Sequence, residues 1–181
     1  MNRVIYFIED QEALTPYILL ARQENRFPGC RILAADSIDD VIEWCPKSDE
    51  NVIFVVDSRM TSEFLSKCLE KALKNSAVNI PDLSELIANE VLTGALGTVV
   101  LKSLKPECRT ILLTAFFKTI SDIRRTQPAL DKMLEKSIDV ALSKTSPEAL
   151  TQAIETQLVE LSRVGRRREG DREVKPEGGM G

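Results

Sequence analysis

The chain has 181 residues, a formal net charge of −4 and no histidine. The missing histidine excludes Ser-His-Asp and Cys-His catalysis, as well as zinc and haem sites that use a histidine ligand. Hydrophobic residues make up 43% and charged residues 29% of the chain, which is typical of a globular domain. The acidic balance gives no support to nucleic acid as a partner.

The cysteines and the apolar runs indicate the cellular compartment. Four cysteines are widely spaced and include no C-x-x-C pair, which argues against a zinc ribbon and favours separate thiols in a reducing compartment: Cys30, Cys45, Cys68 and Cys108. The first apolar run is too short for a signal peptide, and the longest nearly uncharged stretch, residues 91–101, is too short to cross a bilayer. We therefore expect a cytoplasmic protein with no membrane partner.

Short apolar runs alternate with helical patterns along the chain. Residues 4–8 are continuously apolar, as expected for a strand that is buried on both faces. Further candidate strands follow at residues 31–34, which give a weaker signal, and at residues 52–56, 110–113 and 138–142. Helical patterns follow the first and second runs, and Ser37 is a candidate N-cap for the second helix. A further helix opens at Ser146-Pro147-Glu148. This alternation predicts an α/β domain with a parallel sheet that helices cover on both faces.

The connection between the third and fourth strands is too long for one crossover helix. Residues 61–76 predict one helix, which is broken at Asn79-Ile80-Pro81-Asp82. A second helical pattern follows, and Gly94 and Gly97 interrupt it. We interpret residues 76–108 as a helical insert within one domain, which serves either as added packing or as a partner-binding or dimerising surface.

The composition changes near the C-terminal end of the chain. Five of the eight glycines and an arginine cluster fall after residue 163, without apolar periodicity. We expect a folded domain over residues 1–163, followed by a disordered tail or linker over residues 164–181.

Polar side chains stand where the predicted strands end. Glu9 and Asp10 follow the first strand, Asp57 the third, Thr114 the fourth and Lys144 the fifth. In an open parallel sheet, ligands bind outside the carboxyl ends of the strands. Converging carboxylates repel one another unless a cation lies among them, and oxygen ligands of this kind suit Mg²⁺. A hydroxyl and an ammonium group nearby could hold the oxygens of a phosphoryl group.

Together these segments resemble the receiver domains of two-component response regulators. FIEDQEAL at residues 7–14 is similar to the acidic turn of that family, and VVDSRM at 55–60 to its phosphoacceptor motif. LLTA at 112–115 and LSK at 142–144 are similar to its hydroxyl and lysine motifs. The resemblance covers residues 3–162 and implies a flavodoxin-like, doubly wound, five-stranded parallel sheet in the order 2-1-3-4-5.

The resemblance also implies a role for each polar residue. Asp57 would accept a phosphoryl group, while Lys144 and Thr114 would bind the phosphoryl oxygens. The implied Mg²⁺ ligands are Glu9, Asp10, Asp57 and the backbone carbonyl of Arg59. Because the chain has no histidine, the phosphoryl group would come from a separate histidine kinase or phosphotransfer protein. The modified chain would then act as a switch on a downstream protein rather than as a turnover enzyme, and a second copy of the chain is a further candidate partner.

The sequence departs from the family pattern at two places. Ala141 stands where the family usually carries an aromatic switch residue, and either Phe116 or Phe117 substitutes for that residue or the usual readout is altered. The proline that usually follows the lysine at once is displaced to Pro147, which leaves the aim of Lys144 open.

Two alternatives therefore stay beside an active receiver. The first is a degenerate receiver that serves as an interaction module and does not depend on Asp57. The second is an Mg²⁺-dependent phosphatase of the haloacid dehalogenase type. That family needs a second aspartate two residues after the nucleophile, where this chain has Arg59.

Overall fold

The computed structural model describes residues 2–9, 14–60, 65–76, 89–144 and 146–173. Its centre is one five-stranded sheet in the order β2-β1-β3-β4-β5, and all neighbouring strands are parallel. The strands are β1 (Arg3–Ile8), β2 (Cys30–Ala35), β3 (Asn51–Asp57), β4 (Arg109–Thr114) and β5 (Val140–Ser143). The predicted strand number, direction and order are therefore confirmed.

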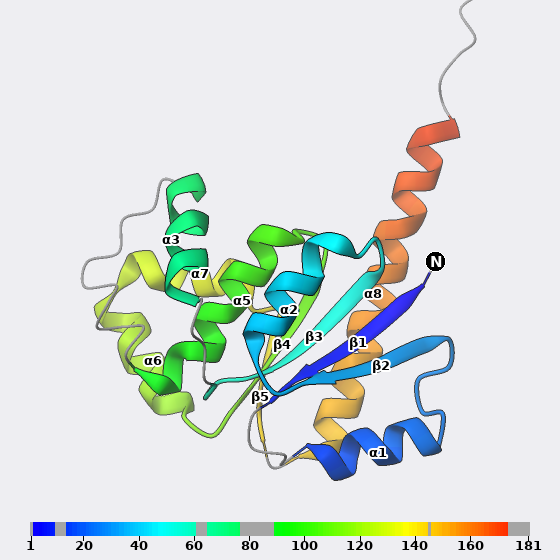
Figure 1. Ribbon diagram of the computed structural model, residues 1–181, viewed down its shortest axis with the longest axis horizontal. Coiled ribbons are helices and arrows are strands. Elements are labelled where there is room, and N and C mark those ends of the chain that lie inside the picture. The colour runs from blue at the N-terminus through cyan, green and yellow to red at the C-terminus, as the bar shows by residue number, and fades with distance from the viewer. Residues whose placement is uncertain (1, 10–13, 61–64, 77–88, 145, 174–181) are drawn as a thin grey trace, which may run out of the picture.

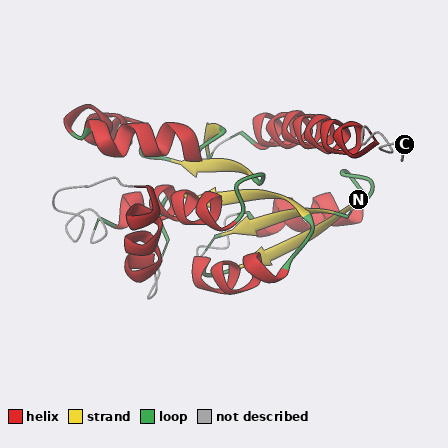
Figure 2. Ribbon diagram, turned by 90° about the horizontal axis from the view of Figure 1, so that it is seen from above, coloured by secondary structure: helices red, strands yellow, loops and turns green. Residues whose placement is uncertain are grey.

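Helices cover both faces of this sheet (Figure 1; Figure 2). The α-helices are α1 (Thr15–Gln23), α2 (Ile38–Trp44), α3 (Leu65–Ser76), α5 (Thr93–Leu104), α6 (Phe117–Thr126), α7 (Pro128–Ser137) and α8 (Pro147–Glu173). Two short 3-10 turns, η1 (Cys45–Lys47) and η2 (Glu90–Leu92), precede β3 and α5. Side chains of α1 and α8 pack on one face of the sheet, whereas α2, α5, α6 and α7 supply the clusters on the other.

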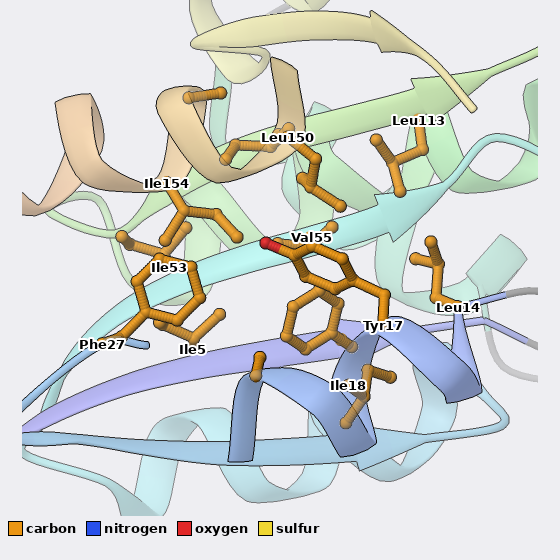
Figure 3. Packing of buried hydrophobic residues seen from close by; sticks show 14 of the residues in the cluster. Ile5, Leu14, Tyr17, Ile18, Phe27, Ile53, Val55, Leu113, Leu150 and Ile154 are labelled. Carbon is orange, nitrogen blue, oxygen red and sulfur yellow. The ribbon is translucent and has the colours of Figure 1, made fainter. Parts of the chain in front are cut away.

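The central strands are apolar between their first and last residues in β1 and β3 because both of their faces are covered. Side chains at alternate positions of a strand point to opposite faces of a sheet. Ile5, Ile53 and Val55 accordingly pack against Tyr17 of α1 and Ile154 of α8 in one core cluster (Figure 3). Their neighbours in the sequence, such as Val4 and Phe54, enter the cluster on the opposite face. The continuous apolar runs were thus a sound signal for buried parallel strands.

Two of the predicted helix starts are confirmed by their side-chain hydrogen bonds. The hydroxyl oxygen of Ser37 accepts a hydrogen bond from the Asp39 backbone N–H at 3.1 Å, at the start of α2. The hydroxyl oxygen of Ser146 accepts one from the Ala149 N–H at 3.2 Å, just before Pro147 opens α8. Each bond satisfies one of the backbone donors that the first turn of a helix leaves unpaired.

Replacing Ser37 by alanine should lower the free energy of unfolding by about 1 kcal/mol, because the Asp39 N–H loses its acceptor. Urea unfolding followed by circular dichroism measures this loss. Ser37→Asp is the matched control, since aspartate caps helices as well as serine does and should keep wild-type stability. An equal loss in both variants would show that the cap contributes nothing.

The connection between β3 and β4 contains α3, η2 and α5 among its described residues. Within it, α5 contacts β3 and β4, and α3 packs against α5. Residues 93–101 of α5 are all buried, because this helix touches both the sheet and α3. A helix with neighbours on several sides must be apolar all round, which explains the uncharged stretch in the sequence.

Gly94 and Gly97 lie inside α5, so the prediction that they interrupt the helix is wrong. Glycine lowers intrinsic helix propensity, but close tertiary packing overrides that preference here. The proposed break at residues 79–82 lies outside the described residues.

Two further differences lie in the C-terminal half. Two helices, α6 and α7, connect β4 to β5, and neither is among the elements predicted from the sequence. Helix α8 continues through residues 164–173, which the sequence assigns to a disordered tail, and its last turns extend past the sheet (Figure 1). Arginine and glutamate are good helix formers, and extending an existing helix needs no new nucleus, so the glycines in this stretch do not end it.

The four cysteines are free thiols, as predicted. Burial raises the pKa of the Cys45 thiol to about 11 and that of Cys108 to about 12, so both are protonated near neutral pH. Among the described residues, no helix combines the length and the apolar character that a membrane span requires.

Candidate functional site

The carboxyl ends of the strands bring together the polar residues that the sequence singles out. The Ile8–Val56, Asp57–Leu113 and Thr114–Ser143 pairs place the ends of β1, β3, β4 and β5 nearly level. Glu9 therefore follows β1 beside Asp57, and Lys144 follows β5 beyond Thr114. The register of the sheet assembles this edge from segments that are far apart in the chain.

Asp57 is the centre of the site. It is the last residue of β3, its side chain is 0% exposed, and the ammonium group of Lys144 donates a hydrogen bond to its Oδ2. A buried carboxylate without a positive partner would be strongly destabilising, so this ion pair is a condition for burying Asp57. The structure also answers the question left by the displaced proline, because Lys144 reaches Asp57 across the end of β4.

The second oxygen of Asp57 is held by the backbone. Oδ1 accepts a hydrogen bond from the Arg59 N–H at 3.0 Å. The neighbouring Ser58 N–H donates to the Leu113 carbonyl at 2.8 Å, which continues the β3–β4 pairing one residue past the strand. The Asp57 carboxylate is therefore fixed by one side chain and by its own loop.

Thr114 contributes a hydroxyl at the end of the neighbouring strand. The side chain is buried, and its Oγ accepts a hydrogen bond from the Phe116 N–H at 2.9 Å. Because this bond uses a lone pair of the oxygen, the hydroxyl hydrogen stays available for an acceptor such as a phosphoryl oxygen.

Glu9 supplies a second carboxylate at this edge. It is buried, and its Oε2 accepts a hydrogen bond from the Leu14 N–H at 2.6 Å, which ties the end of β1 to the residue before α1. The other predicted acid, Asp10, lies outside the described residues. Within the described part of the chain, no three Cys, Asp or Glu side chains form a metal-ligand group, so the magnesium site stays a prediction.

The start of α5 belongs to the site and was missed at the level of sequence. The Gly94 N–H donates to the Ser58 carbonyl at 2.9 Å, and a Cβ atom at position 94 would lie 1.7 Å from the Asp57 carbonyl oxygen. Only a residue without a side chain fits there, because the helix backbone touches the backbone of the loop that holds Asp57. A glycine within an otherwise apolar helical pattern was the available signal for such a close approach.

Solved structures with similar folds provide an independent comparison. A CheY-like response regulator receiver domain protein from Methanospirillum hungatei is 15% identical and covers 90% of this chain and 98% of its own, with a TM-score of 0.55. The response regulator TrrA from Thermotoga maritima, in complex with Mg²⁺ and BeF, is 14% identical and covers 87% and 99%, with a TM-score of 0.51. The chain has the fold of a response regulator receiver domain.

Other comparisons limit what this likeness carries. A structure named adenylate cyclase from Rhodopirellula baltica, 15% identical, covers 96% of this chain and 100% of its own, with a TM-score of 0.58. No family model matches the sequence, and no curated protein is similar to it. The structural likeness shows the receiver fold. At identities this low, the roles of individual residues depend on the geometry of this chain.

Proposed function

We propose that the chain is a signalling receiver domain that accepts a phosphoryl group on Asp57. The observation that carries this proposal is the buried Asp57 carboxylate paired with Lys144 at the carboxyl edge of a receiver-fold sheet. The buried hydroxyl of Thr114 ends the neighbouring strand. A carboxylate, an ammonium group and a hydroxyl at one edge are the groups that a transferred phosphoryl group requires.

The side chains suggest how the transfer would proceed. An oxygen of Asp57 attacks the phosphorus atom, the new O–P bond forms, and the bond to the leaving group of the donor breaks. Lys144 then exchanges its contact with the carboxylate for one with a phosphoryl oxygen, and the hydroxyl of Thr114 donates to another. Both movements would change the surface next to β4 and β5.

Magnesium would complete this site. The residues that would hold the ion are Glu9, Asp10, Asp57 and the backbone carbonyl of Arg59. Their oxygen donors fit the preference of Mg²⁺, and the one cation that pairs with Asp57 in the described structure, Lys144, cannot neutralise a carboxylate and a phosphoryl group together. When bound, the ion would stabilise the negative charge that develops on the phosphoryl oxygens.

The missing histidine specifies the direction of transfer. A chain without histidine cannot carry a phosphohistidine, so the donor would be a separate histidine kinase or phosphotransfer protein. The modified chain would act on a downstream protein through a change in its surface and would turn over no substrate of its own. Cytoplasmic localisation is consistent with this role.

Incubation with Mg²⁺ and acetyl phosphate should add one phosphoryl group to the wild type and none to Asp57→Asn, as read by intact-protein mass spectrometry. Asp49→Asn is the matched control, because Asp49 is exposed and lies outside the site, and it should be modified like the wild type. Beryllofluoride, which mimics a bound phosphoryl group, provides a second readout through NMR.

Two outcomes would contradict the proposal. Modification of Asp57→Asn would place the acceptor elsewhere. A folded wild type that stays unmodified with every donor and does not respond to beryllofluoride would favour the degenerate receiver, which keeps the fold as an interaction module. Ala141 in place of an aromatic residue is the feature that keeps this second candidate open.

A further inference from the structure

The strand β2 leaves one edge of the sheet without a neighbour among the described strands. The Ala35 carbonyl points toward β1, since it accepts a hydrogen bond from the Glu9 N–H at 3.1 Å. The Ile32 carbonyl points the other way and accepts one from the guanidinium group of Arg22 on α1 at 2.8 Å. Because the backbone groups of a strand alternate in direction, Ile32 and Ala34 present their N–H and C=O groups to the open side.

This edge lacks features that usually prevent strand pairing. Natural edge strands carry lysine or proline, contain bulges or are covered by another segment. β2 pairs with β1 over its whole length, and its one charged residue, Arg31, is bound to Glu50 at 2.7 Å. Ala34 is exposed, and Ser37 is still extended, with φ −132° and ψ 145°. An extended chain can therefore pair with β2 as far as Asp36.

Two charges of opposite sign lie along the same edge. Arg22 is exposed, and its hydrogen bond to Ile32 holds the guanidinium group on the outer side of β2. Asp36 is exposed directly after β2, 36 − 32 = 4 residues beyond Ile32. Among the described residues, none forms an ion pair with Arg22 or Asp36. Both side chains can therefore meet opposite charges of another chain.

An exposed leucine stands beside this edge. Leu19 lies one helical turn before Arg22, so the two side chains share the face of α1 that is next to β2 (Figure 1). The Leu19 side chain is 49% exposed. Ile32 packs with the α1 cluster, and by the alternation of the strand Ala34 lies on the same face of the sheet. The α1 side of the edge thus combines an apolar side chain, a small one and the two charges.

We propose that two copies of the chain pair through β2, antiparallel and around a two-fold axis at Ala34. In this register Ala34 lies opposite Ala34 of the second copy, and Ile32 lies opposite Asp36 of the second copy. The Ile32 carbonyl has two lone pairs, so it can keep its bond to Arg22 while it accepts one from the second copy.

Charge complementarity identifies a second copy as the occupant of the edge. Arg22 is held at Ile32, so it would lie next to Asp36 of the second copy, and the two-fold axis repeats this contact. The two Leu19 side chains would lie on the same side of the joined sheet and bury apolar surface against each other. One chain therefore supplies every group that the paired edge requires.

The expected association is weak because it uses one short strand and one helix face. A standard stable interface buries about 800 Å² per partner, and a contact of this extent supports a dimer that forms only as the concentration rises. β2 and β5 are the opposite edges of the sheet, and the pairing does not involve Asp57. Asp57→Asn should therefore associate like the wild type, so this inference and the proposed function can fail separately.

Sedimentation equilibrium of the full chain at a series of concentrations measures the association. Arg22→Asp and Asp36→Arg should each raise the Kd of the dimer at least about tenfold, because each replaces two attractive contacts by two repulsive ones. An equimolar mixture of the two variants should associate like the wild type, since both contacts then join opposite charges again. Asp36→Arg changes the net charge from −4 to −4 + 2 = −2, so general repulsion cannot explain its weaker association.

Two further variants complete the test. Arg125→Asp is the matched control, because Arg125 is 79% exposed on α6 and the charge changes as in Arg22→Asp, so the Kd should stay unchanged. Ala34→Lys places like charges directly opposite each other at the axis and should raise the Kd at least about tenfold. The inference would be overturned by a wild type that stays monomeric at about 1 mM, by a mixture that associates no better than its components, or by an unchanged Kd in Ala34→Lys.

Discussion

Gly94→Ala should lower the free energy of unfolding by about 3 kcal/mol and strongly reduce modification of Asp57. The added Cβ would lie 1.7 Å from the Asp57 carbonyl oxygen and 2.9 Å from the Ser58 Cα. Both atoms belong to the backbone of a loop that is held by hydrogen bonds to β4 and α5, so they cannot rotate away. Either α5 shifts and loses packing against the sheet, or the loop shifts and moves the Asp57 carboxylate away from Lys144.

Gly97→Ala is the matched control for this prediction. It changes the same residue type three positions along the same helix, and its Cβ would lie 2.0 Å from Ile38 Cδ1. That atom is the end of a flexible side chain, which can adopt another rotamer. The cost of this repacking is offset by the higher helix propensity of alanine, so stability should change by no more than about 1 kcal/mol.

Urea unfolding and mass spectrometry after incubation with acetyl phosphate provide the two readouts. The predicted order is a large loss of both stability and modification for Gly94→Ala and little change for Gly97→Ala. If Gly94→Ala kept wild-type stability, the close approach of α5 to the Asp57 loop would be incorrect. Equal losses in both variants would show that α5 is sensitive to any added side chain.

Asp139→Asn should lower the free energy of unfolding by about 2 kcal/mol. Asp139 lies just before β5, at the amino end of the strand, whereas the candidate site lies at the carboxyl ends of the strands. Its carboxylate receives Lys102 and Arg109, each at 2.9 Å, and the Thr110 N–H at 2.8 Å. Its side chain is only 16% exposed. After the charge is removed, little water can therefore reach the two cations to replace the carboxylate.

The contribution of Asp139 should depend on pH in a defined direction. Burial alone would raise its pKa, but the hydrogen bonds from Lys102, from the Thr110 amide and from Arg109 outweigh burial and hold the pKa below its ordinary value of 3.8. A carboxyl group whose pKa is lower in the folded state contributes its full stabilisation at pH values above its pKa in the unfolded state. That stabilisation is lost as the pH falls below about 4 and through the folded pKa.

Unfolding curves of wild type and Asp139→Asn at a series of pH values measure this dependence. The difference in stability should be constant near neutral pH and should shrink from about pH 4 downward, because protonation removes the same charge from the wild type. Asp122→Asn is the control, since Asp122 forms an exposed contact with Arg125 at 4.0 Å and should change stability little. A difference that stayed constant down to pH 2 would contradict the role of the Asp139 charge. Modification of Asp57 should be unaffected in both variants.

The sequence predicted the sheet and most of the site for one physical reason. Strands buried on both faces must be continuously apolar, so each strand ends visibly where the first polar side chain appears. Glu9, Asp57 and Thr114 are those side chains, Lys144 follows Ser143 at the end of β5, and a parallel sheet brings such ends to one edge whatever the connections contain. The hydrogen bonds of Ser37 and Ser146 were predictable as well, because helix caps are local.

The placement of the helices was less predictable, because it depends on neighbours that are distant in the sequence. α5 and α3 are both helical patterns, and only the tertiary structure decides that α5 lies against β3 and β4 with α3 on top of it. From the sequence, Gly94 predicts an interruption of the helix. In the structure, the reason for the glycine is the Asp57 carbonyl group, which lies next to it. The end of α8 was predicted too early, since glycine content outweighed the helix propensity of its arginines and glutamates.

The sequence by itself determined which groups stand at the strand ends: an aspartate, a hydroxyl and a lysine, in a chain without histidine. The tertiary structure decided what surrounds these groups. It placed Lys144 on Asp57, closed α5 against the loop behind it, and left β2 with an open edge beside Arg22. Periodicity records which residues are buried, whereas contacts are properties of segments that meet only in the fold.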